Sequence, residues 1–299
     1  MKSVRKPGGD TERKAILIGM NIVVFQKKCL MKPVTLLFAI LIALTVTSCK
    51  KEKDNQPEVS KNESRMVKWQ HESWGSRITR LFEYNTNGKI SKQTTVLPPI
   101  DQASGERVVT HTFQYGTNGK IATEEQLSPD GKIFYGHYSY NPDGRLNRFE
   151  YKDDTGLVVL SLDYVYAGST IELKITHAPN GGVTNYKINL DGTGNISDIW
   201  CQWGINPEYW QAVSGTTYDN TPNVFSTIRG MECFYMLTSP DAFSGILPKN
   251  NILEYKSHTL NNGPVYSSGQ IYEYSSTGLA TKRLSEDGMT VDIFTYEEY

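Results

Sequence analysis

One recurring phrase constrains the fold of this chain more than any other feature: an aromatic residue, any residue, Tyr, a short turn, Gly, a basic residue and an aliphatic residue. Full copies occupy 82–90, 113–121 and 138–146, and a weaker copy occupies 272–279. Aromatic residues at positions i and i+2 lie on one face of a strand. The Asn-Gly or Asp-Gly of the turn supplies the positive-φ residues of a tight hairpin. Each copy therefore predicts a β-hairpin.

Alternating polarity between the copies predicts that the hairpins form one continuous run. In 170–177, Ile171, Leu173 and Ile175 share one face, and polar or charged residues occupy the other. Such strands are typical of a half-buried antiparallel sheet. Further turns of the same chemistry are Pro129-Asp130-Gly131, Asn180-Gly181-Gly182, Asp191-Gly192 and Asp287-Gly288. We predict an all-β fold, an antiparallel up-and-down meander of about 14 hairpin-linked strands, curled or closed into a barrel-like sheet because flat sheets of that size are uncommon.

The phrase resembles the YD repeats of RHS-type proteins. Residues 65–299 as a whole more closely resemble a family of Bacteroidetes lipoproteins of unknown function, described as having a porin-like fold. The stretch 218–225 (YDNTPNVF) is similar to the family's Tyr-Asp-Asn-x-x-Asn-Pro-Phe, with Val224 where Pro is usual, and 248–252 (PKNNI) is similar to its Asn-Asn strand entry. The resemblance implies a barrel-like shape for this single domain, and it assigns no catalytic residue.

An export signal precedes the repeats. Met31 and Lys32 are followed by an apolar run at 34–46 and by Cys49. A basic start, an apolar core of roughly 13 residues and small residues before the cut are typical of a secretory signal peptide, and a membrane-spanning helix needs about 20 residues. The stretch 46–49 (VTSC) resembles the bacterial lipobox, which implies that Cys49 becomes the lipidated first residue. The alternative is an uncleaved anchor with an incidental Cys.

The other N-terminal segments are interpreted relative to Cys49. Residues 1–30 are an upstream extension from a misassigned start codon, and residues 31–48 are the lipoprotein signal peptide. Residues 49–64 form a charged, flexible tether without aromatic residues. Acyl chains on Cys49 would hold the protein on the membrane. We therefore expect a lipid-anchored outer-membrane protein, with the periplasmic and cell-surface sides both open.

Charge after processing excludes one class of partner. Residues 1–48 hold eight of the 31 Lys/Arg and two of the 32 Asp/Glu, so residues 49–299 keep 23 basic and 30 acidic side chains and a net charge of about −7. Nucleic acids and anionic lipid surfaces are bound by basic patches. We therefore expect no nucleic-acid partner.

The repeated phrase is missing from residues 200–250. We interpret this segment as an excursion from the sheet that forms a lid or a plug. The spacing of Val224, Ile228, Met231 and Tyr235 is compatible with a short helix there. One hypothesis is that aromatic side chains of the excursion form a platform for a sugar ring. The alternative is that they cap the core of the sheet. The candidate ligand-binding residues are Trp200, Trp203, Tyr209 and Trp210.

Cys201 and Cys233 lie in the same excursion and could form a disulfide in an oxidising envelope compartment, or remain free, buried thiols. Neither has metal-ligand spacing, and the five histidines are scattered singly. The stretch 189–196 matches the first half of a calcium loop, but position 12 is Trp200 where an acid is needed. Nucleophile-elbow, phosphate-loop and dinucleotide fingerprints are absent from the sequence. We expect no metal, no cofactor and no enzymatic activity.

The leading hypothesis is a non-enzymatic envelope lipoprotein that binds a glycan, a peptide or a protein through one end of its sheet. The alternative is a structural or accessory component of an outer-membrane complex. A hydrolase with paired carboxylates in a cleft ranks third. An integral channel ranks last, because Glu297 and Glu298 interrupt the terminal apolar pattern of such barrels.

Overall fold

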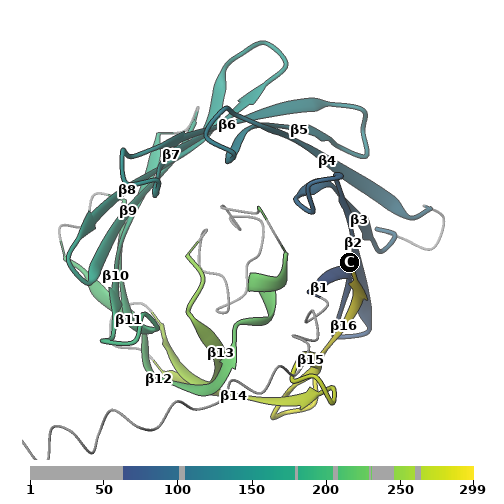
Figure 1. The fold of residues 1–299 in the computed structure, drawn as a ribbon. Helices are drawn as coiled ribbons and strands as arrows, with labels where there is room; N and C mark the ends of the chain where they lie inside the picture. Colours follow the sequence, from purple (N-terminus) through teal and green to yellow (C-terminus); the bar gives the residue numbers. More distant parts are fainter. Residues whose placement is uncertain are drawn as a thin grey trace, which may run out of the picture. The chain divides into compact units, whose positions relative to one another are not determined.

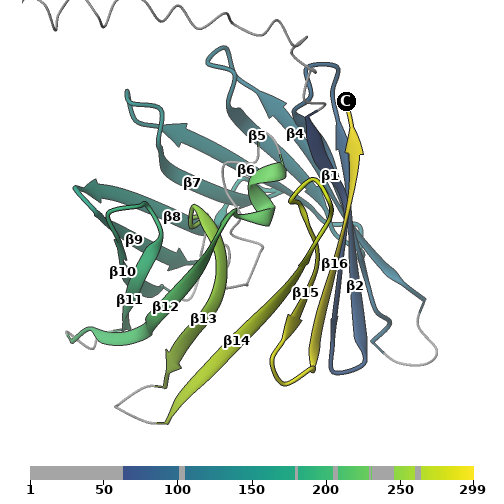
Figure 2. The same ribbon diagram turned by 60° about the horizontal axis from the view of Figure 1, so that its bottom comes forward.

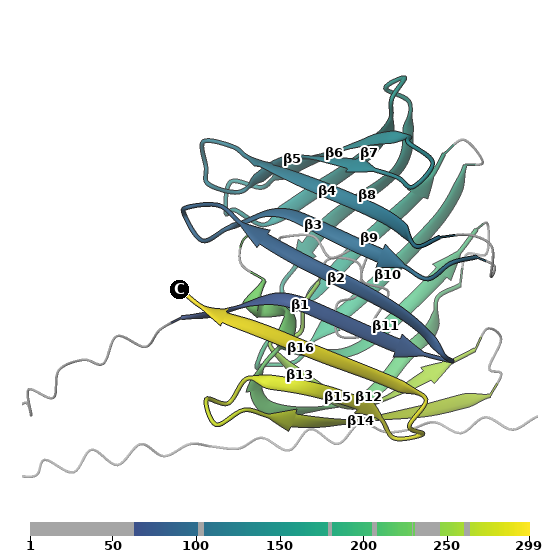
Figure 3. The same ribbon diagram turned by 90° about the vertical axis from the view of Figure 1, so that its right-hand side faces the viewer.

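The chain folds into a closed β-barrel. A computed structural model describes residues 63–100, 105–178, 181–204, 208–228, 230, 246–259 and 264–299. These residues form sixteen strands in which each neighbour in sequence is a neighbour in space and the last strand pairs with the first. Figure 1 looks along the barrel, and Figure 3 shows the strands running obliquely around it. The predicted all-β meander is confirmed, with sixteen strands against the about 14 that the sequence pattern predicts.

The strands are six to thirteen residues long and pair antiparallel throughout. They are β1 (Ser64–Ser73), β2 (Ser76–Tyr84), β3 (Ile90–Leu97), β4 (Arg107–Tyr115), β5 (Ile121–Leu127), β6 (Ile133–Tyr140), β7 (Leu146–Asp153), β8 (Val158–Ala167), β9 (Thr170–His177), β10 (Gly182–Leu190), β11 (Ile196–Trp203), β12 (Trp210–Pro222), β13 (Asn250–His258), β14 (Val265–Tyr274), β15 (Ala280–Ser285) and β16 (Thr290–Glu298). No helix among the described residues is long and apolar enough to cross a membrane.

The two ends of the barrel differ. Because successive strands run in opposite directions, the turns that carry the repeated phrase (β2–β3, β4–β5, β6–β7 and β14–β15) all lie at one end, which we call the phrase end (Figure 2). Strand β1 begins and β16 ends there, where the Tyr299 hydroxyl donates to the Glu63 carboxylate (2.9 Å) and Arg65 pairs with Glu297 (2.7 Å). The β1–β2 and β15–β16 turns lie at the opposite end, which we call the far end.

The phrase turns have a different geometry from the one that the sequence predicts. In each full copy the glycine N–H donates to the carbonyl three residues earlier, as from Gly88 to Asn85 (2.9 Å). Only the glycine is left-handed, with φ of 73° at Gly88 and 85° at Gly144. The turns are therefore three-residue loops with a glycine bulge, and the residue before the glycine keeps a negative φ. Among the described residues, a left-handed pair occurs at the β1–β2 turn, in Trp74 and Gly75.

The tyrosines of the second and third copies, and Tyr166 after the third copy, join neighbouring hairpins. Each hydroxyl donates to the carbonyl of the aliphatic residue that ends the preceding copy, and the basic residue before that aliphatic residue lies over the tyrosine ring. The hydrogen bonds are Tyr115 to Ile90 (2.7 Å), Tyr140 to Ile121 (2.8 Å) and Tyr166 to Leu146 (2.8 Å). The ring contacts are Lys89 over Tyr115, Lys120 over Tyr140 and Arg145 over Tyr166. The spacing of the phrase thus encodes a joint between one copy and the next.

The apolar face of the strands points into the barrel and the charged face points out. The core is lined by side chains such as Phe113, Phe149 and Leu173, all buried. The outer face carries cross-strand ion pairs, which are Lys92–Glu83, Arg148–Asp163 and Lys282–Glu273, each at 2.8 Å. The inside of the barrel is therefore the hydrophobic core of the domain.

The described part of the excursion is shorter than the sequence predicts. Strands β11 and β12 continue the wall as far as Pro222, and the chain turns inward only after that residue. There η2 (Val224–Thr227), one turn of 3₁₀ helix, lies inside the ring of strands (Figure 1). Phe225 is fully buried, with its ring 4.8 Å from that of Trp69 and 6.2 Å from that of Phe294. This segment packs against the inner wall, Ile228 follows it as the C-cap, and Met231 and Tyr235 of the predicted helix lie outside the described residues.

Buried amides hold η2 in place. Asn223 caps it by accepting the Phe225 N–H (2.9 Å), and Asn251 on β13 accepts the Val224 N–H (2.8 Å). The Asn251 amide also donates to Asp219 on β12 (3.2 Å). These residues belong to the two stretches on which the family resemblance rests, so those stretches fasten the inward segment to the wall.

Candidate functional site

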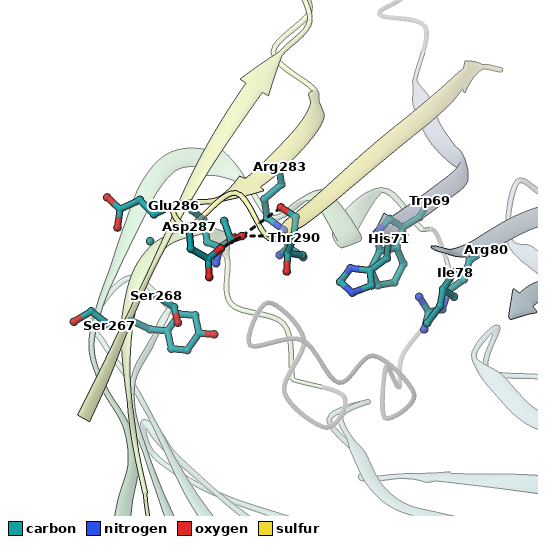
Figure 4. A pocket seen from close by; sticks show the side chains of 14 residues that line it. Trp69, His71, Ile78, Arg80, Ser267, Ser268, Arg283, Glu286, Asp287 and Thr290 are labelled. Atoms are coloured by element: carbon teal, nitrogen blue, oxygen red, sulfur yellow. Dashed lines mark hydrogen bonds between the residues drawn. The ribbon is translucent and has the colours of Figure 1, made fainter. Parts of the chain in front are cut away.

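A cavity of about 780 Å³ lies on the inner wall at the far end, beside the β15–β16 turn. Figure 4 shows side chains from β1 and β2 on one side of it and side chains from β14 and the β15–β16 turn on the other. The first side consists of Trp69, His71, Ile78 and Arg80, and the second of Ser267, Ser268, Glu286 and Asp287. Arg283 and Thr290 lie between them.

A fully buried carboxylate, that of Asp292, contacts three of the side chains that line the cavity. It lies directly opposite Arg283 on β15 and His71 on β1. Arg283 donates to it through Nε (2.9 Å) and Nη2 (2.7 Å), the Trp69 indole donates at 2.7 Å, and His71 Nδ1 lies 2.9 Å away. Burial works to raise the pKa of Asp292, but the charge of Arg283 and the bonds from His71 and Trp69 outweigh it and hold the pKa below its ordinary value.

Arg80 lies beside this network without a carboxylate of its own. Its guanidinium stacks on the Trp69 ring, with Cζ 4.3 Å from the ring centroid. Among the described residues it donates no hydrogen bond and forms no ion pair. Burial lowers the pKa of Arg80 to about 10, against the opposing charge of Asp292. The group is still charged at neutral pH, so the cavity wall carries an unpaired positive charge.

The sequence interpretation missed Arg80 and Asp292, although a signal for them exists. Arg80 and Asp292 each lie two residues before a pair of aromatic residues spaced i and i+2, and so does His111. Because residues i and i+2 share a face, a charged residue at this position must point into the barrel with the aromatics. The pairs that follow are Phe82/Tyr84, Phe294/Tyr296 and Phe113/Tyr115. Which of these inward polar groups meet each other depends on the strand register.

A second group of inward polar residues continues along β3, β4 and β5. Gln93 lies opposite His111, which lies opposite Gln126, and Glu124 is the next inward residue on β5. His111 Nδ1 is 3.9 Å from one Glu124 oxygen, and the Tyr138 hydroxyl donates to the other (2.6 Å). The first Glu124 oxygen and the Gln126 carbonyl oxygen accept no hydrogen bond from the described residues.

Burial biases this second group toward its neutral forms. It raises the pKa of Glu124 to about 7, and the hydrogen bond from Tyr138 opposes the rise only in part. It lowers the pKa of His111 to about 4, and the positive charge of Arg80 contributes to the lowering. The inner wall therefore carries a permanent charge at Arg80 and a titratable one at Glu124.

The aromatic residues predicted to form one platform are divided between the faces of the sheet. Cys201 on β11 is buried and lies directly opposite Trp210 on β12, so Trp210 is on the inner face. Trp200, the residue before Cys201, is on the outer face, where its indole donates to Asp198 (2.6 Å). Trp203 ends β11 and is 62% exposed.

Tyr209 lies under the Nζ of Lys187, 4.7 Å from its ring centroid, and Lys187 is the cross-strand neighbour of Trp200. Tyr209 is thus grouped with Trp200 outside the barrel, apart from Trp210. The structure does not bring the four side chains to one surface, and their role in ligand binding stays a prediction.

Cys201 carries no disulfide among the described residues; it shares a hydrogen bond with Tyr186, and burial raises the pKa of its thiol. Cys233 lies outside the described residues, as does Cys49, so both the disulfide and the lipidation stay predictions. The calcium-like stretch forms the β10–β11 turn, in which Asp191 Oδ1 accepts the N–H groups of Thr193 (2.8 Å) and Asn195 (3.0 Å).

No protein-family model matches this chain. No curated protein matches it either. Among solved structures, it is similar to a porin-like protein from Bacteroides uniformis, at 13% identity and a TM-score of 0.40, with 78% of this chain and 98% of that chain covered. A porin-like protein from Bacteroides vulgatus gives 13% identity, a TM-score of 0.44 and the same coverage. A chain of the TcdB2-TccC3-Cdc42 crystal structure gives 12% identity and a TM-score of 0.31, with 74% of this chain and 14% of that chain covered. These similarities assign no residue a role.

Proposed function

We propose that this chain is a lipid-anchored, non-enzymatic binding protein of the outer membrane, and that its barrel takes a small polar ligand into the far-end cavity. The observation that carries the proposal is the cavity of about 780 Å³, which brings an unpaired guanidinium and several hydroxyl groups to one place. Ligand sites in proteins commonly have about 300–1,000 Å³ and a few convergent polar groups. A glycan unit or a short peptide has a suitable size.

The outer face of the barrel supports attachment through lipid on Cys49. Lipid-facing strands carry an apolar band on the outside of the barrel. Here the outward positions of β2–β3 and β7–β8 hold the ion pairs Lys92–Glu83 and Arg148–Asp163. These ion pairs interrupt an apolar band, so a separate anchor would hold the barrel at a membrane, and the signal peptide followed by Cys49 would supply one.

The arrangement of carboxylates in the cavity favours binding over hydrolysis. Glu286 and Asp287 line it, but they are consecutive residues of one turn. Asp287 Oδ1 accepts the Ser285 hydroxyl (2.5 Å) and the Met289 N–H (2.9 Å), which are contacts that shape the turn. A glycosidase instead places two carboxyl groups on either side of the scissile bond.

The ligand site is tested by filling the cavity. Ser268→Trp places a large side chain in it, and Glu273→Trp places the same side chain on the outer face of the same strand. Full-length protein purified from membranes in detergent would be screened against saccharides and short peptides by thermal shift, followed by calorimetry. We expect a ligand that binds the wild type and Glu273→Trp and binds Ser268→Trp at least about tenfold more weakly. Equal binding to both variants, or no ligand at all, contradicts the proposal.

The anchor is tested on the same preparation. The N-terminal peptide should carry acyl chains on Cys49, and Cys49→Ala should leave the protein unlipidated and release it from membranes. An unmodified Cys49 thiol in the mature protein would contradict this part.

A second candidate function, an accessory role in an outer-membrane complex, is favoured by an apolar patch on the outer face of β14–β16. Ile271 lies opposite Leu284, which lies opposite Val291, and Ile271 and Ile293 are 54% and 39% exposed. Apolar groups gathered in this way suit a protein partner. A photo-crosslinker at position 293 in intact membranes should capture one defined protein, and failure to capture any would remove this candidate.

A further inference from the structure

Arg80 is held against an aromatic ring. Its Cζ lies over the Trp69 ring, 4.3 Å from the centroid, and Trp69 is itself held by a hydrogen bond to Asp292 (2.7 Å) and by an edge contact with Phe225 (4.8 Å between ring centroids). The N–H groups of a guanidinium form a fork that matches a carboxylate. The contact with Trp69 restricts Arg80, so binding an anion costs less side-chain freedom.

The ionisable groups at the cavity differ in their partners. Arg283 and His71 both face Asp292, whereas Arg80 forms no ion pair with any described lining residue. Glu286 and Asp287 lie on the opposite side of the cavity (Figure 4). The cavity thus has a positive side at β2 and a negative side at the β15–β16 turn.

Hydroxyl and amide groups lie on the β14 side of the cavity, with the two carboxylates, and between the two sides. Ser267, Ser268 and Gln270 on β14 line the cavity, together with Thr290 on β16. These groups donate and accept hydrogen bonds, and the two carboxylates accept them. A ligand with many hydroxyl groups can therefore bond to this wall while an anionic group reaches Arg80.

We infer that the ligand of this cavity is an acidic saccharide, whose carboxylate is bound by Arg80 and whose hydroxyl groups bond to the opposite wall. The inference rests on the proposed function and adds the ligand class to it. A neutral sugar would leave Arg80 without an anion, and a small inorganic anion would leave the hydroxyl-binding wall unused.

The test compares glucuronate with glucose, which has the same hydroxyl groups on its ring and a CH2OH group in place of the carboxylate, and with inorganic sulfate as a bare anion. Affinities would be measured by calorimetry on the full-length protein in detergent. Arg80→Gln removes the positive charge. Arg80→Lys keeps the charge but removes the forked pair of N–H donors that matches a carboxylate. Arg77→Gln, on the outer face of the same strand, is the matched control.

For the wild type we expect glucuronate to bind about 10- to 100-fold more tightly than glucose, the factor associated with a charge-assisted hydrogen-bonded pair. Arg80→Gln should abolish this preference, Arg80→Lys should reduce it, and Arg77→Gln should keep it. Equal wild-type affinities for glucose and glucuronate overturn the inference without using any variant, and so does equal binding of sulfate and glucuronate.

The failure of this inference and the failure of the proposed function give different results. If only neutral saccharides or peptides bind, and Ser268→Trp blocks them, the cavity is a binding site and the acidic-ligand inference is wrong. If glucuronate binds but is insensitive to both Ser268→Trp and Arg80→Gln, the site is elsewhere and both are wrong.

Discussion

The hydroxyl of Tyr140 donates a 2.8 Å hydrogen bond to the carbonyl oxygen of Ile121, the residue that ends the preceding copy of the repeat. The same bond joins Tyr115 to Ile90. The repeat therefore describes more than a hairpin, because the first and second copies each contain the acceptor for the tyrosine of the copy that follows. Each such bond ties one hairpin to its neighbour in a fixed register.

Tyr140→Phe should lower the free energy of unfolding by about 1 kcal/mol, since it removes one hydrogen bond and leaves the ring in place. Urea denaturation followed by circular dichroism measures the change. Tyr135→Phe is the control, because Tyr135 lies on the outer face of the same strand and is 38% exposed. A similar loss in both variants would mean that the joint contributes nothing specific.

Gly136→Ala should be destabilising by about 1–3 kcal/mol through overpacking of the core. A Cβ atom at Gly136 would lie 2.5 Å from Glu124 Cγ and 2.8 Å from the Phe149 ring. Gly192→Ala, in the β10–β11 turn, meets no atom within 4 Å and should be close to neutral. Thermal and urea melts of the two variants test this, and an unchanged Gly136→Ala protein would show that Glu124 can move aside.

Glu124→Gln should stabilise the protein in a pH-dependent way. The pKa of Glu124 is about 7 in the folded chain, against an ordinary value of 4.5. Between these values the unfolded chain loses the proton while the folded chain keeps it, so the stability of the wild type falls as the pH rises through this window. Glutamine keeps an acceptor for Tyr138 and removes the titration. The variant should gain up to about 3 kcal/mol over the wild type by pH 8 and little at pH 4.5.

Unfolding free energies of both proteins, measured from pH 4.5 to 8, test this prediction. The lowered pKa of His111 destabilises the folded chain below about pH 6.5, but it does so in both proteins and largely cancels in their difference. Glu125→Gln, on the outer face of β5, should follow the wild type. A difference that does not depend on pH would show that Glu124 does not titrate in this window.

Asn251→Ala should loosen the inward segment. It removes the acceptor of the Val224 N–H and a donor to Asp219, and a buried group left unbonded costs about 1–3 kcal/mol. Because Phe225 packs against Trp69, the indole fluorescence should shift together with the loss of stability. Asn220→Ala, at an exposed position of β12, is the control. An unchanged Trp69 signal in Asn251→Ala would show that the other contacts of η2 are sufficient.

The hairpins could be predicted because their signals are local. The positive φ of Gly88 and the shared face of Phe82 and Tyr84 follow from properties of neighbouring residues. The type of turn could not be predicted, because a three-residue loop with a glycine bulge and a two-residue turn both use an Asn-Gly pair. The length of the wall was also misjudged, because β11 and β12 are regular strands without the phrase.

The candidate site could not be predicted, although its residues have the expected polarity pattern. Arg80 and Asp292 each point inward for a reason visible in the sequence, the alternation with the aromatic pair that follows. What joins them is the pairing of β1 with β16, which brings His71 beside Asp292 across 221 residues of sequence. The sequence around Arg80 and the sequence around Asp292 do not indicate that these two residues of distant strands lie close together.

Local sequence was sufficient to establish which side chains share a face and where the chain reverses, because a strand alternates with a period of two and a left-handed position selects glycine. Three other features depend on the folded barrel: the sheet closes after sixteen strands, η2 turns into the lumen, and Arg80 forms no ion pair beside the Arg283–Asp292 pair. Closure depends on strand twist, register and interior packing, added over all the strands of the barrel. It therefore cannot be predicted from any single stretch of sequence.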